Sequence, residues 1–232
     1  LRYAPKKNIR EVTGNFVFAL GHRRLSIIDV SPAGHQPMCS ADKNVWIVFN
    51  GEIYNYIEIR EELKQKGFSF ETNTDTEVIL AAYQHWGENC VKQFNGMWVF
   101  VIFDKKRNVL FGSRDRFGVK PFYYYKDENV FAFASEQKSL LKLSSVKSGI
   151  NFSAAANFLA GDVEYIEHQN ESLFTNIHEL MPSCSFRLNL QNNNFQTYFY
   201  YSLSVNLQSR NFDEQEFNVC RDETKSLLVN AI

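Results

Sequence analysis

The sequence has few cysteines, and their arrangement excludes two common uses. Its 232 residues include four cysteines, and no two of them form a CxxC pair. A chain of this length with so few cysteines does not suit a disulfide framework. The five histidines do not cluster with the cysteines, so zinc ligation is not indicated. We therefore expect reduced, buried thiols at Cys39, Cys90, Cys184 and Cys220.

The sequence also lacks an excess of charge and a long apolar run. Lys and Arg number 25 against 26 Asp and Glu, a formal net charge of -1. This balance gives no electrostatic case for nucleic acid or an anionic membrane as a partner. No apolar run approaches the ~20 residues that span a bilayer, and no signal-peptide pattern is present. We expect a cytoplasmic protein.

Aromatic residues are abundant, with 21 Phe and 11 Tyr among 44% hydrophobic residues. Such a composition favours β structure. Apolar runs predict strands at 45–49, 97–103, 109–113, 122–125 and 130–135. Helical spacing predicts helices over about 55–66 and from the TNTD segment to Gly87. Strands with a few helices among them indicate an α+β fold with packed sheets, not a series of βαβ units.

The pattern changes near the end of the chain. Asp213 and Glu216 have capping-box spacing, and apolar residues then recur on one helical face from Phe217 onward. This helix resembles the first helix of a further domain. We place one domain at residues 1–205, and a linker with that first helix at 206–232. The phosphate-binding loops GxGxxG and GxxxxGKS/T are both absent.

The segment VWIVFNGEIYNY, residues 45–56, contains the first candidate site. Asn-Gly is a common hairpin dipeptide, but a helical pattern begins within a few residues of Gly51. We therefore expect Asn50-Gly51 at the exit of a buried strand toward a helix. Glycine permits close approach of the backbone to a ligand. A side-chain amide with a backbone N–H is one standard way to build an oxyanion hole.

Charged residues elsewhere each allow two interpretations. Arg24 could grip a carboxylate with two parallel hydrogen bonds, or belong to a solvated basic patch. Asp75 could pair with a ligand ammonium, with Glu52 on the other side, or simply cap a helix. Taken together, Arg24, Asn50, Gly51, Glu52 and Asp75 form a candidate amino-acid pocket.

The stretch SRDRFGVKPFYYY, residues 113–125, mixes basic and aromatic side chains. Such a mixture can bind single-stranded nucleic acid. A Gly-Val-Lys-Pro turn that joins two strands explains the stretch equally well.

Five segments, in this order along the chain, resemble one family: GHRRLSIIDVSPAGHQPM, FNGEIYNY, TDTEVILAAY, FNGMWVFVIFD and SRDRFGVKPFYY. They resemble the N-terminal class II glutamine amidotransferase domain of glutamine-hydrolysing asparagine synthetases. The resemblance is dense over roughly residues 15–145 and looser to about 205. It implies the N-terminal-nucleophile hydrolase fold, a four-layer α/β/β/α sandwich of two antiparallel sheets.

The resemblance also implies a function. Glutamine would be hydrolysed to glutamate and ammonia, and the ammonia would pass to an ATP-dependent synthetase domain of the same protein. That domain would use ATP and Mg²⁺ to amidate aspartate, which makes the whole protein a ligase of asparagine biosynthesis. The glutaminase domain itself is expected to hold no cofactor or metal. Family members are commonly dimers, so a homodimer is expected.

The matched motifs carry the family's roles onto this chain. Arg24 would bind the glutamine α-carboxylate, and Glu52 and Asp75 the amino group. Asn50 and Gly51 would form the oxyanion hole. The backbone from Arg24 onward would line the pocket through Leu25, Ser26, Ile27 and Ile28.

One departure from the family concerns the nucleophile, which in the family is a cysteine at the mature N-terminus. This chain begins at Leu1, and its first cysteine is Cys39, which follows the HQPM loop. Either a segment before Leu1 is missing or the natural protein lacks the nucleophile, and we expect these residues alone to be inactive. The alternatives are an amidotransferase for a surface-polysaccharide sugar or carboxylate, and a non-catalytic glutaminase-like scaffold.

Overall fold

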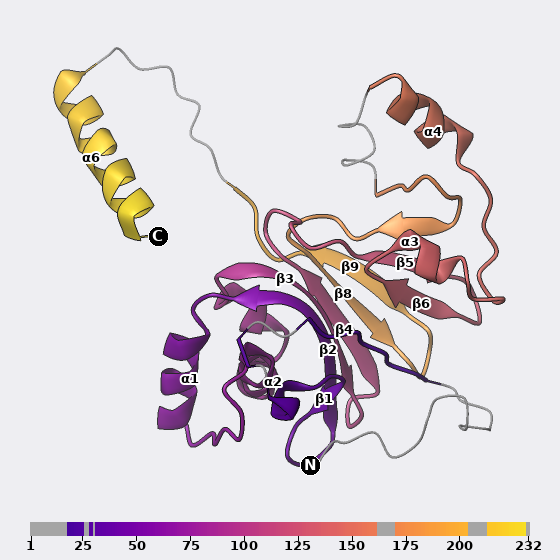
Figure 1. Ribbon diagram of the computed structural model, residues 1–232, viewed down its shortest axis with the longest axis horizontal. Coiled ribbons are helices and arrows are strands. Elements are labelled where there is room, and N and C mark those ends of the chain that lie inside the picture. The colour runs from indigo at the N-terminus through magenta and orange to yellow at the C-terminus, as the bar shows by residue number, and fades with distance from the viewer. Residues whose placement is uncertain (1–17, 26–27, 30, 162–169, 204–212, 231–232) are drawn as a thin grey trace. The chain divides into compact units, whose positions relative to one another are not determined.

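The computed structural model describes residues 18–25, 28–29, 31–161, 170–203 and 213–230. The chain divides into two compact units, Leu1–Ser202 and Leu203–Ile232. Within its described residues, the first unit contains two antiparallel sheets with helices packed on them (Figure 1). The α+β fold expected from the sequence is confirmed.

The larger sheet has six strands, and all neighbouring strands are antiparallel. Its central strands are rich in Val, Ile and Phe, the residue types that suit a pleated, buried surface. In spatial order the strands are β1 (Met38–Cys39), β2 (Val45–Ile53), β3 (Gly96–Asp104), β4 (Val109–Arg114), β8 (Cys184–Asn189) and β9 (Phe195–Phe199).

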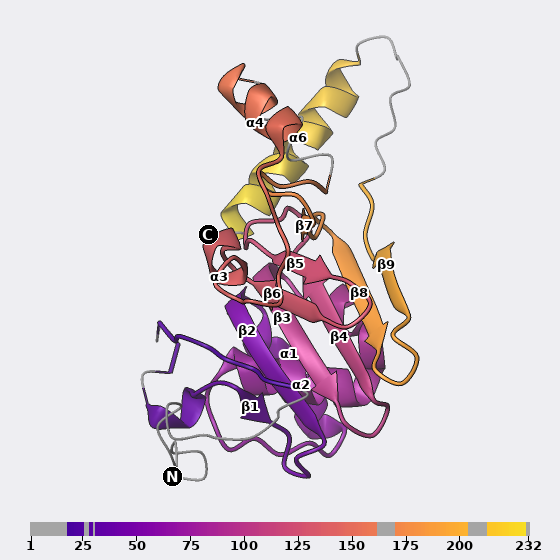
Figure 2. The same ribbon diagram turned by 90° about the vertical axis from the view of Figure 1, so that its right-hand side faces the viewer.

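The smaller sheet has three strands in the order β6 (Phe131–Ala134), β5 (Tyr123–Lys126) and β7 (Ile177–Glu179). Figures 1 and 2 show it on the opposite face of the larger sheet from α1 and α2. The sequence predicted the β5–β6 hairpin. It did not predict β7, which is only three residues long and too short to show a strand pattern.

Helices cover the outer faces of the sheets. The helix α2 begins after Thr74, whose Oγ accepts the Glu77 N–H at 3.2 Å, and it ends at Trp86, followed by the C-cap residue Gly87, whose φ is +61°. Among the described residues, the cover on the smaller sheet includes the single turn α3, which contacts β5 and β6. The helices of this unit are α1 (Tyr56–Gln65), α2 (Asp75–Trp86), α3 (Gln137–Leu140), α4 (Phe152–Leu159) and the 3-10 turns Pro32–Gly34 and Gly87–Lys92.

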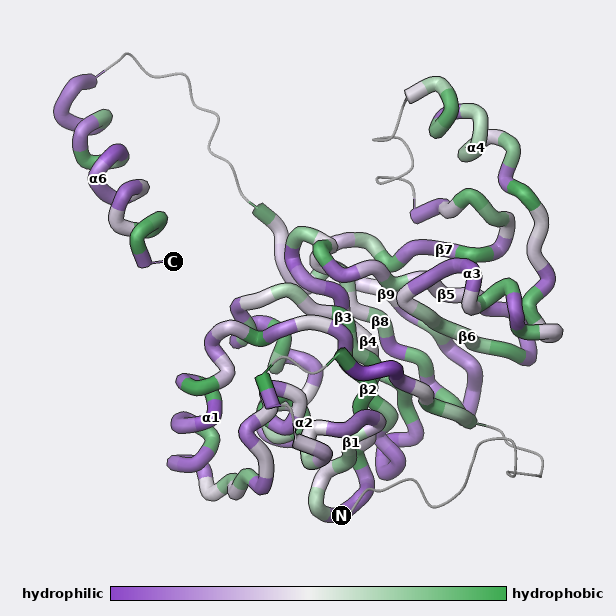
Figure 3. The backbone as a smooth tube through the Cα atoms, in the orientation of Figure 1, coloured by the Kyte–Doolittle hydropathy of each residue, from purple (hydrophilic) through white to green (hydrophobic). Residues whose placement is uncertain are grey.

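Two cores form because successive residues of a strand point to opposite faces. Ile47 and Phe49 of β2 pack toward α1 and α2, whereas Val48 packs toward the smaller sheet. Burial on both faces explains the continuous apolar run at 45–49, which lacks polar alternation. Figure 3 shows the contrast, with hydrophobic green along the central strands and alternating purple and green along the surface helix α1.

One expectation from the sequence needs correction. The buried strand does not end at Asn50, because β2 continues to Ile53 and the helix begins only at Tyr56. Gly51 pairs with Trp98 of β3, and Ile53 pairs with Gly96. Asn50-Gly51 is therefore neither a hairpin turn nor a strand exit, but lies inside a paired strand.

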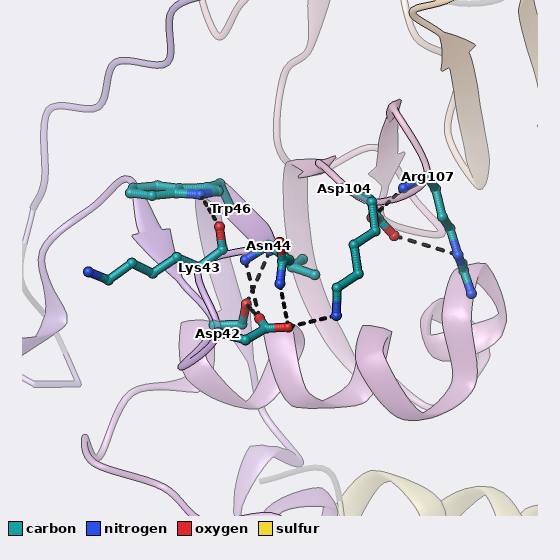
Figure 4. Close-up of polar contacts among 9 residues, drawn as sticks. Asp42, Lys43, Asn44, Trp46, Asp104 and Arg107 are labelled. Carbon is teal, nitrogen blue, oxygen red and sulfur yellow. Dashed lines mark hydrogen bonds and ion pairs between the residues drawn. The ribbon is translucent and has the colours of Figure 1, made fainter.

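A polar clamp fixes the opposite end of β2. The Asp42 carboxylate accepts hydrogen bonds from Ser40 Oγ at 2.7 Å, Asn44 Nδ2 at 2.7 Å and Lys106 Nζ at 3.1 Å (Figure 4). Since Lys106 belongs to the β3–β4 turn, this clamp joins the two turns at the start of β2. Residues 50–52, at the other end of the strand, take no part in this clamp.

The SRDR segment contains a second polar brace, which is buried. The Asp115 carboxylate, 1% exposed, accepts backbone N–H groups from Trp98 at 3.2 Å, Phe117 at 3.1 Å, and Val119 and Lys120 at 3.0 Å. One carboxylate thus holds the turn after β4 against the neighbouring strand β3.

Arg114, the residue before Asp115, also has its side chain bound within the protein. Its guanidinium donates to the carbonyls of Lys120 at 2.7 Å, Gly118 at 2.7 Å and Leu180 at 2.5 Å, and pairs with Glu179 at 2.8 Å. Both Arg114 and Asp115 are buried. Their burial favours the interpretation of this stretch as a turn between two strands over that of a nucleic-acid-binding surface.

The second unit is described from Asp213 to Asn230 and contains α6 (Glu214–Asn230). Asp213 Oδ1 accepts the Glu216 N–H at 2.8 Å, as the capping spacing predicted. None of its described helical residues is buried within the structure. No described helix of the protein has the length and apolarity that a membrane crossing requires.

We predict that Asp115→Ala lowers the free energy of unfolding by about 3 kcal/mol or more, because it removes the acceptor of several buried N–H groups. Urea unfolding followed by circular dichroism measures the loss. Asp127→Ala is the matched control, since Asp127 accepts N–H groups in an exposed turn where water can replace it. Equal losses in the two variants would contradict the proposed role of the buried brace.

Candidate active site

A cavity of about 730 Å³ opens beside the second half of β2. Its volume lies in the range of small-molecule sites, about 300–1,000 Å³. Residues 21–25 and 28–29, residues 48–52 of β2 and residues 74–76 at the start of α2 form one side. Residues of the smaller sheet and α3 form the other. Seven of the nine candidate residues line it: Arg24, Leu25, Ile28, Asn50, Gly51, Glu52 and Asp75. The other two, Ser26 and Ile27, lie outside the described residues.

The edge of β2 directs a backbone N–H toward this cavity. Beyond the two-residue strand β1, the N–H of Phe49 donates to Gln36 Oε1 at 2.5 Å, and that of Ile53 donates to Asp75 Oδ2 at 3.1 Å. Alternate residues of a strand turn their N–H groups to the same side. The N–H of Gly51, midway between them, therefore points to the same edge of β2, and this edge lines the cavity.

Gly51 is required by the close pairing of β2 and β3. Its φ is +149°, and a Cβ here would lie 2.7 Å from the Cα of Trp98 and even closer to the carbonyl oxygen of Met97. Only glycine adopts this conformation at low cost. A larger residue at 51 would push the two strands apart and move the N–H that faces the cavity.

Asn50 and Glu52 share the face of β2 that carries Val48. This face turns toward the smaller sheet, so both side chains enter the cavity from the strand. Both are partly buried. Among the described residues, no hydrogen bond or ion pair holds either side-chain head group, which leaves an amide and a carboxylate for a ligand.

Asp75 is buried, with 5% of its surface exposed, at the first turn of α2. Its burial, together with the nearby charge of Glu52, raises the pKa of its carboxyl to about 6, although backbone N–H groups of Ile53 and Thr76 oppose the rise. The capping interpretation of Asp75 is wrong, because Thr74 caps the helix. A buried acid with a raised pKa beside a second acid is typical of a functional site.

Arg24 is partly buried and held in place by the loop that follows it. Its Nη1 donates to the Ser31 carbonyl at 2.8 Å, and its Nη2 donates to the Asp29 carbonyl. The interpretation as a solvated basic patch does not hold for Arg24, although it fits Arg23, which is exposed. The guanidinium lines the cavity as a cation of fixed position.

Three cavity residues were not singled out from the sequence. Gln36 holds the strand edge as described above, and Gly34 lies against Arg24. Burial lowers the pKa of the His22 imidazole, the Phe49 backbone opposes this fall, and the Arg24 charge lowers the pKa further. The only signal for these residues is their place in the GHRR and GHQP runs, which does not reveal contacts with a distant strand.

None of the four cysteines is among the described residues that line the cavity. Cys39, Cys90 and Cys184 are buried elsewhere, and burial raises the pKa of the Cys184 thiol to about 11. Cys220 is exposed on α6, so the expectation of a buried thiol is wrong for this residue.

Two antiparallel sheets with helices and a cavity beside β2 form a fold that has a counterpart among solved structures. Among solved structures, the chain is similar to glutamine phosphoribosylpyrophosphate amidotransferase of Bacillus subtilis in complex with ADP and GMP. The similarity has a TM-score of 0.52 at 17% identity, and covers 80% of this chain and 35% of that chain. At this identity the likeness concerns the fold alone.

The family is shown by sequence. The model of the glutamine amidotransferase domain matches residues 10–201, and the chain belongs to this family. Asparagine synthetase (glutamine-hydrolysing) 1 of Bacillus subtilis strain 168 is 54% identical over 121 residues, 52% of this chain and 19% of that protein. Asparagine synthetase (glutamine-hydrolysing) 3 of the same strain is 33% identical over 223 residues, 95% of this chain and 35% of that protein. The chain therefore spans about a third or less of these relatives.

The raised pKa of Asp75 predicts a pH-dependent stability. In the unfolded chain this carboxyl ionises near 3.8, and in the folded chain at about 6. The folded state therefore binds more protons between these values, and its free energy of unfolding falls as pH rises from about 4 to about 6. The difference between the two pKa values corresponds to about 3 kcal/mol of stability, which is present below about pH 4 and has been lost once the pH exceeds about 6.

Asp75→Asn removes this titration but keeps an acceptor for the Ile53 N–H. We expect the variant to gain stability over the wild type as pH rises from 4 to 7, with little difference below pH 4. Unfolding curves at several pH values measure the gain. A difference that stays constant over this pH range would show that Asp75 ionises normally.

Proposed function

We propose that the cavity binds L-glutamine, and that the chain is the glutaminase part of an asparagine synthetase. The observation that supports this most is the convergence on one cavity of a fixed guanidinium, a buried carboxylate and a strand-edge N–H that has no partner among the described residues. An α-amino acid with a side-chain carbonyl requires these three kinds of partner. The names of the relatives favour glutamine as this amino acid.

Each group has a role in this proposal. Arg24 binds the α-carboxylate of glutamine, and Asp75 with Glu52 binds its ammonium group. A ligand ammonium also stabilises the ionised form of Asp75, which its burial disfavours. The side-chain carbonyl lies near the Asn50 amide and the Gly51 N–H, which become the oxyanion hole.

The chemistry follows from this placement. A thiolate attacks the amide carbon, and the negative charge that develops on the carbonyl oxygen is stabilised by Asn50 and Gly51. The nitrogen of the tetrahedral species takes up a proton as its bond to carbon breaks and leaves as ammonia, and water then hydrolyses the resulting thioester to glutamate and the free thiol. A free α-amine, with a pKa of ~7.7–8.0, is a suitable base near neutral pH. These residues supply the binding groups and oxyanion donors, but no thiol in the cavity.

The acceptor reaction lies with the other part of such a protein. We propose that the ammonia amidates aspartate in an ATP- and Mg²⁺-dependent synthetase domain of the same protein, with α6 as that domain's first helix. The support is the names of the relatives and the fact that this chain spans only 19% and 35% of their lengths.

We predict that the 232-residue chain binds L-glutamine in isothermal titration calorimetry, and that Arg24→Ala weakens binding by about tenfold or more. The reason is the loss of a charge-assisted pair with the carboxylate. Arg187→Ala is the matched control, because Arg187 lies on β8 and does not line the cavity. Equal affinity in the wild type and Arg24→Ala would show that Arg24 does not bind the ligand. If the wild type does not bind glutamine at all, glutamine is not the ligand of this chain.

We also predict that these 232 residues release no glutamate or ammonia from glutamine, since no cysteine lines the cavity. A coupled glutamate assay over hours, with and without glutamine, tests this. If glutamate appears, Cys39→Ser identifies the source: loss of turnover in that variant would make Cys39 an unexpected nucleophile.

A further inference from the structure

We propose that Gly34 is a positioning residue that seats the Arg24 guanidinium, and thereby makes the site specific for a ligand with a free α-carboxylate. This inference rests on the proposed function and adds a determinant of its specificity. It starts from a contact: a Cβ at position 34 would lie 2.7 Å from Arg24 Cζ and closer still to Nη2. The guanidinium therefore occupies the space that any other residue would fill.

The seat is built by Asp29 and residues 31–34. Asp29 Oδ1 accepts the Ser31 N–H at 2.8 Å, and Ser31 Oγ accepts the Ala33 N–H at 3.2 Å, which caps the short 3-10 turn Pro32–Gly34. These bonds fix the Asp29 and Ser31 carbonyls, which are the two acceptors for Arg24. The guanidinium is thus held at one side by carbonyls and supported beneath by a residue without a side chain.

Gly34 also connects the two ends of the proposed ligand site. The same Cβ would lie 2.9 Å from Thr74 Cγ2, and Thr74 is the cap of α2 immediately before Asp75. Arg24, Gly34 and Thr74 therefore pack in one stack. The stack sets the separation between the cation that binds the carboxylate and the acid that binds the ammonium.

The seat leaves donors for a ligand. A guanidinium has five N–H groups, and among the described residues the Ser31 and Asp29 carbonyls accept hydrogen bonds from two of them. The remaining groups belong to a side chain that lines the cavity. A carboxylate can take two of them in parallel, whereas an α-amide lacks the charge and the second acceptor oxygen.

Gly34→Ala tests the inference, because no positive φ is found at Gly34, so alanine fits the backbone there and only the contact with Arg24 and Thr74 changes. Titration calorimetry with L-glutamine and with L-glutamine α-amide gives a discrimination ratio for each variant. We expect Gly34→Ala to bind glutamine about ten- to a hundredfold more weakly, and to lose most of its preference for the free acid. Gly149→Ala is the matched control, since a Cβ there meets only Thr175 Oγ1 at 3.6 Å.

A double-mutant cycle separates positioning from a general structural effect. If Gly34 acts through Arg24, the variant with both Gly34→Ala and Arg24→Ala binds glutamine no more weakly than Arg24→Ala alone. Additive losses, or wild-type discrimination by Gly34→Ala, would overturn the inference and leave glutamine binding intact. Failure of the wild type to bind glutamine would instead overturn the proposed function.

Discussion

The uncovered edge of β2 is the constraint on which the candidate site depends. Because β1 has only two residues, the N–H groups beyond it have no strand partner in the described part of the chain, and buried N–H groups rarely stay unpaired. Gln36 and Asp75 satisfy the N–H groups of Phe49 and Ile53. The N–H of Gly51 between them faces the cavity. A ligand carbonyl that binds there continues a hydrogen-bonding pattern that the sheet leaves open.

The two halves of the site are held rigidly for different reasons. The strand half is fixed by β3, whose backbone approaches Gly51 so closely that no side chain fits between them, and β3 is itself braced by Asp115. The loop half is fixed by hydrogen bonds to the carbonyls of Asp29 and Ser31. Groups that are fixed before the ligand arrives bind it at a smaller entropic cost than groups that must first be ordered.

The sequence predicted the parts of the fold that rest on local patterns. The helices α1 and α2, the strands β3 to β6 and the cap at Asp213 follow from spacing and capping, which involve neighbours in the chain. The end of β2 did not, because its last three residues are held by pairing with 96–98, which no local pattern shows. The local sequence around Arg24 and Asp75 did not decide between their two interpretations either, because their deciding contacts are with residues distant in the chain. Arg24 contacts Gly34, ten positions away, and Asp75 meets Ile53 across 22 positions.

The two acids of the cavity show how stability and binding compete in this fold. Burial, with a smaller contribution from the Glu52 charge, raises the pKa of Asp75, so ionising Asp75 in the folded chain costs folding free energy near neutral pH. An apolar residue at position 75 would remove that cost. A cation bound beside the two carboxylates lowers the pKa of Asp75 and offsets the free-energy cost of its ionisation. The ammonium group of an amino acid has the required charge, and the proposed function assigns its carboxylate to Arg24, which lines the same cavity. Under the proposed function, the cost of ionising the buried Asp75 carboxyl therefore favours a ligand that carries a positive charge.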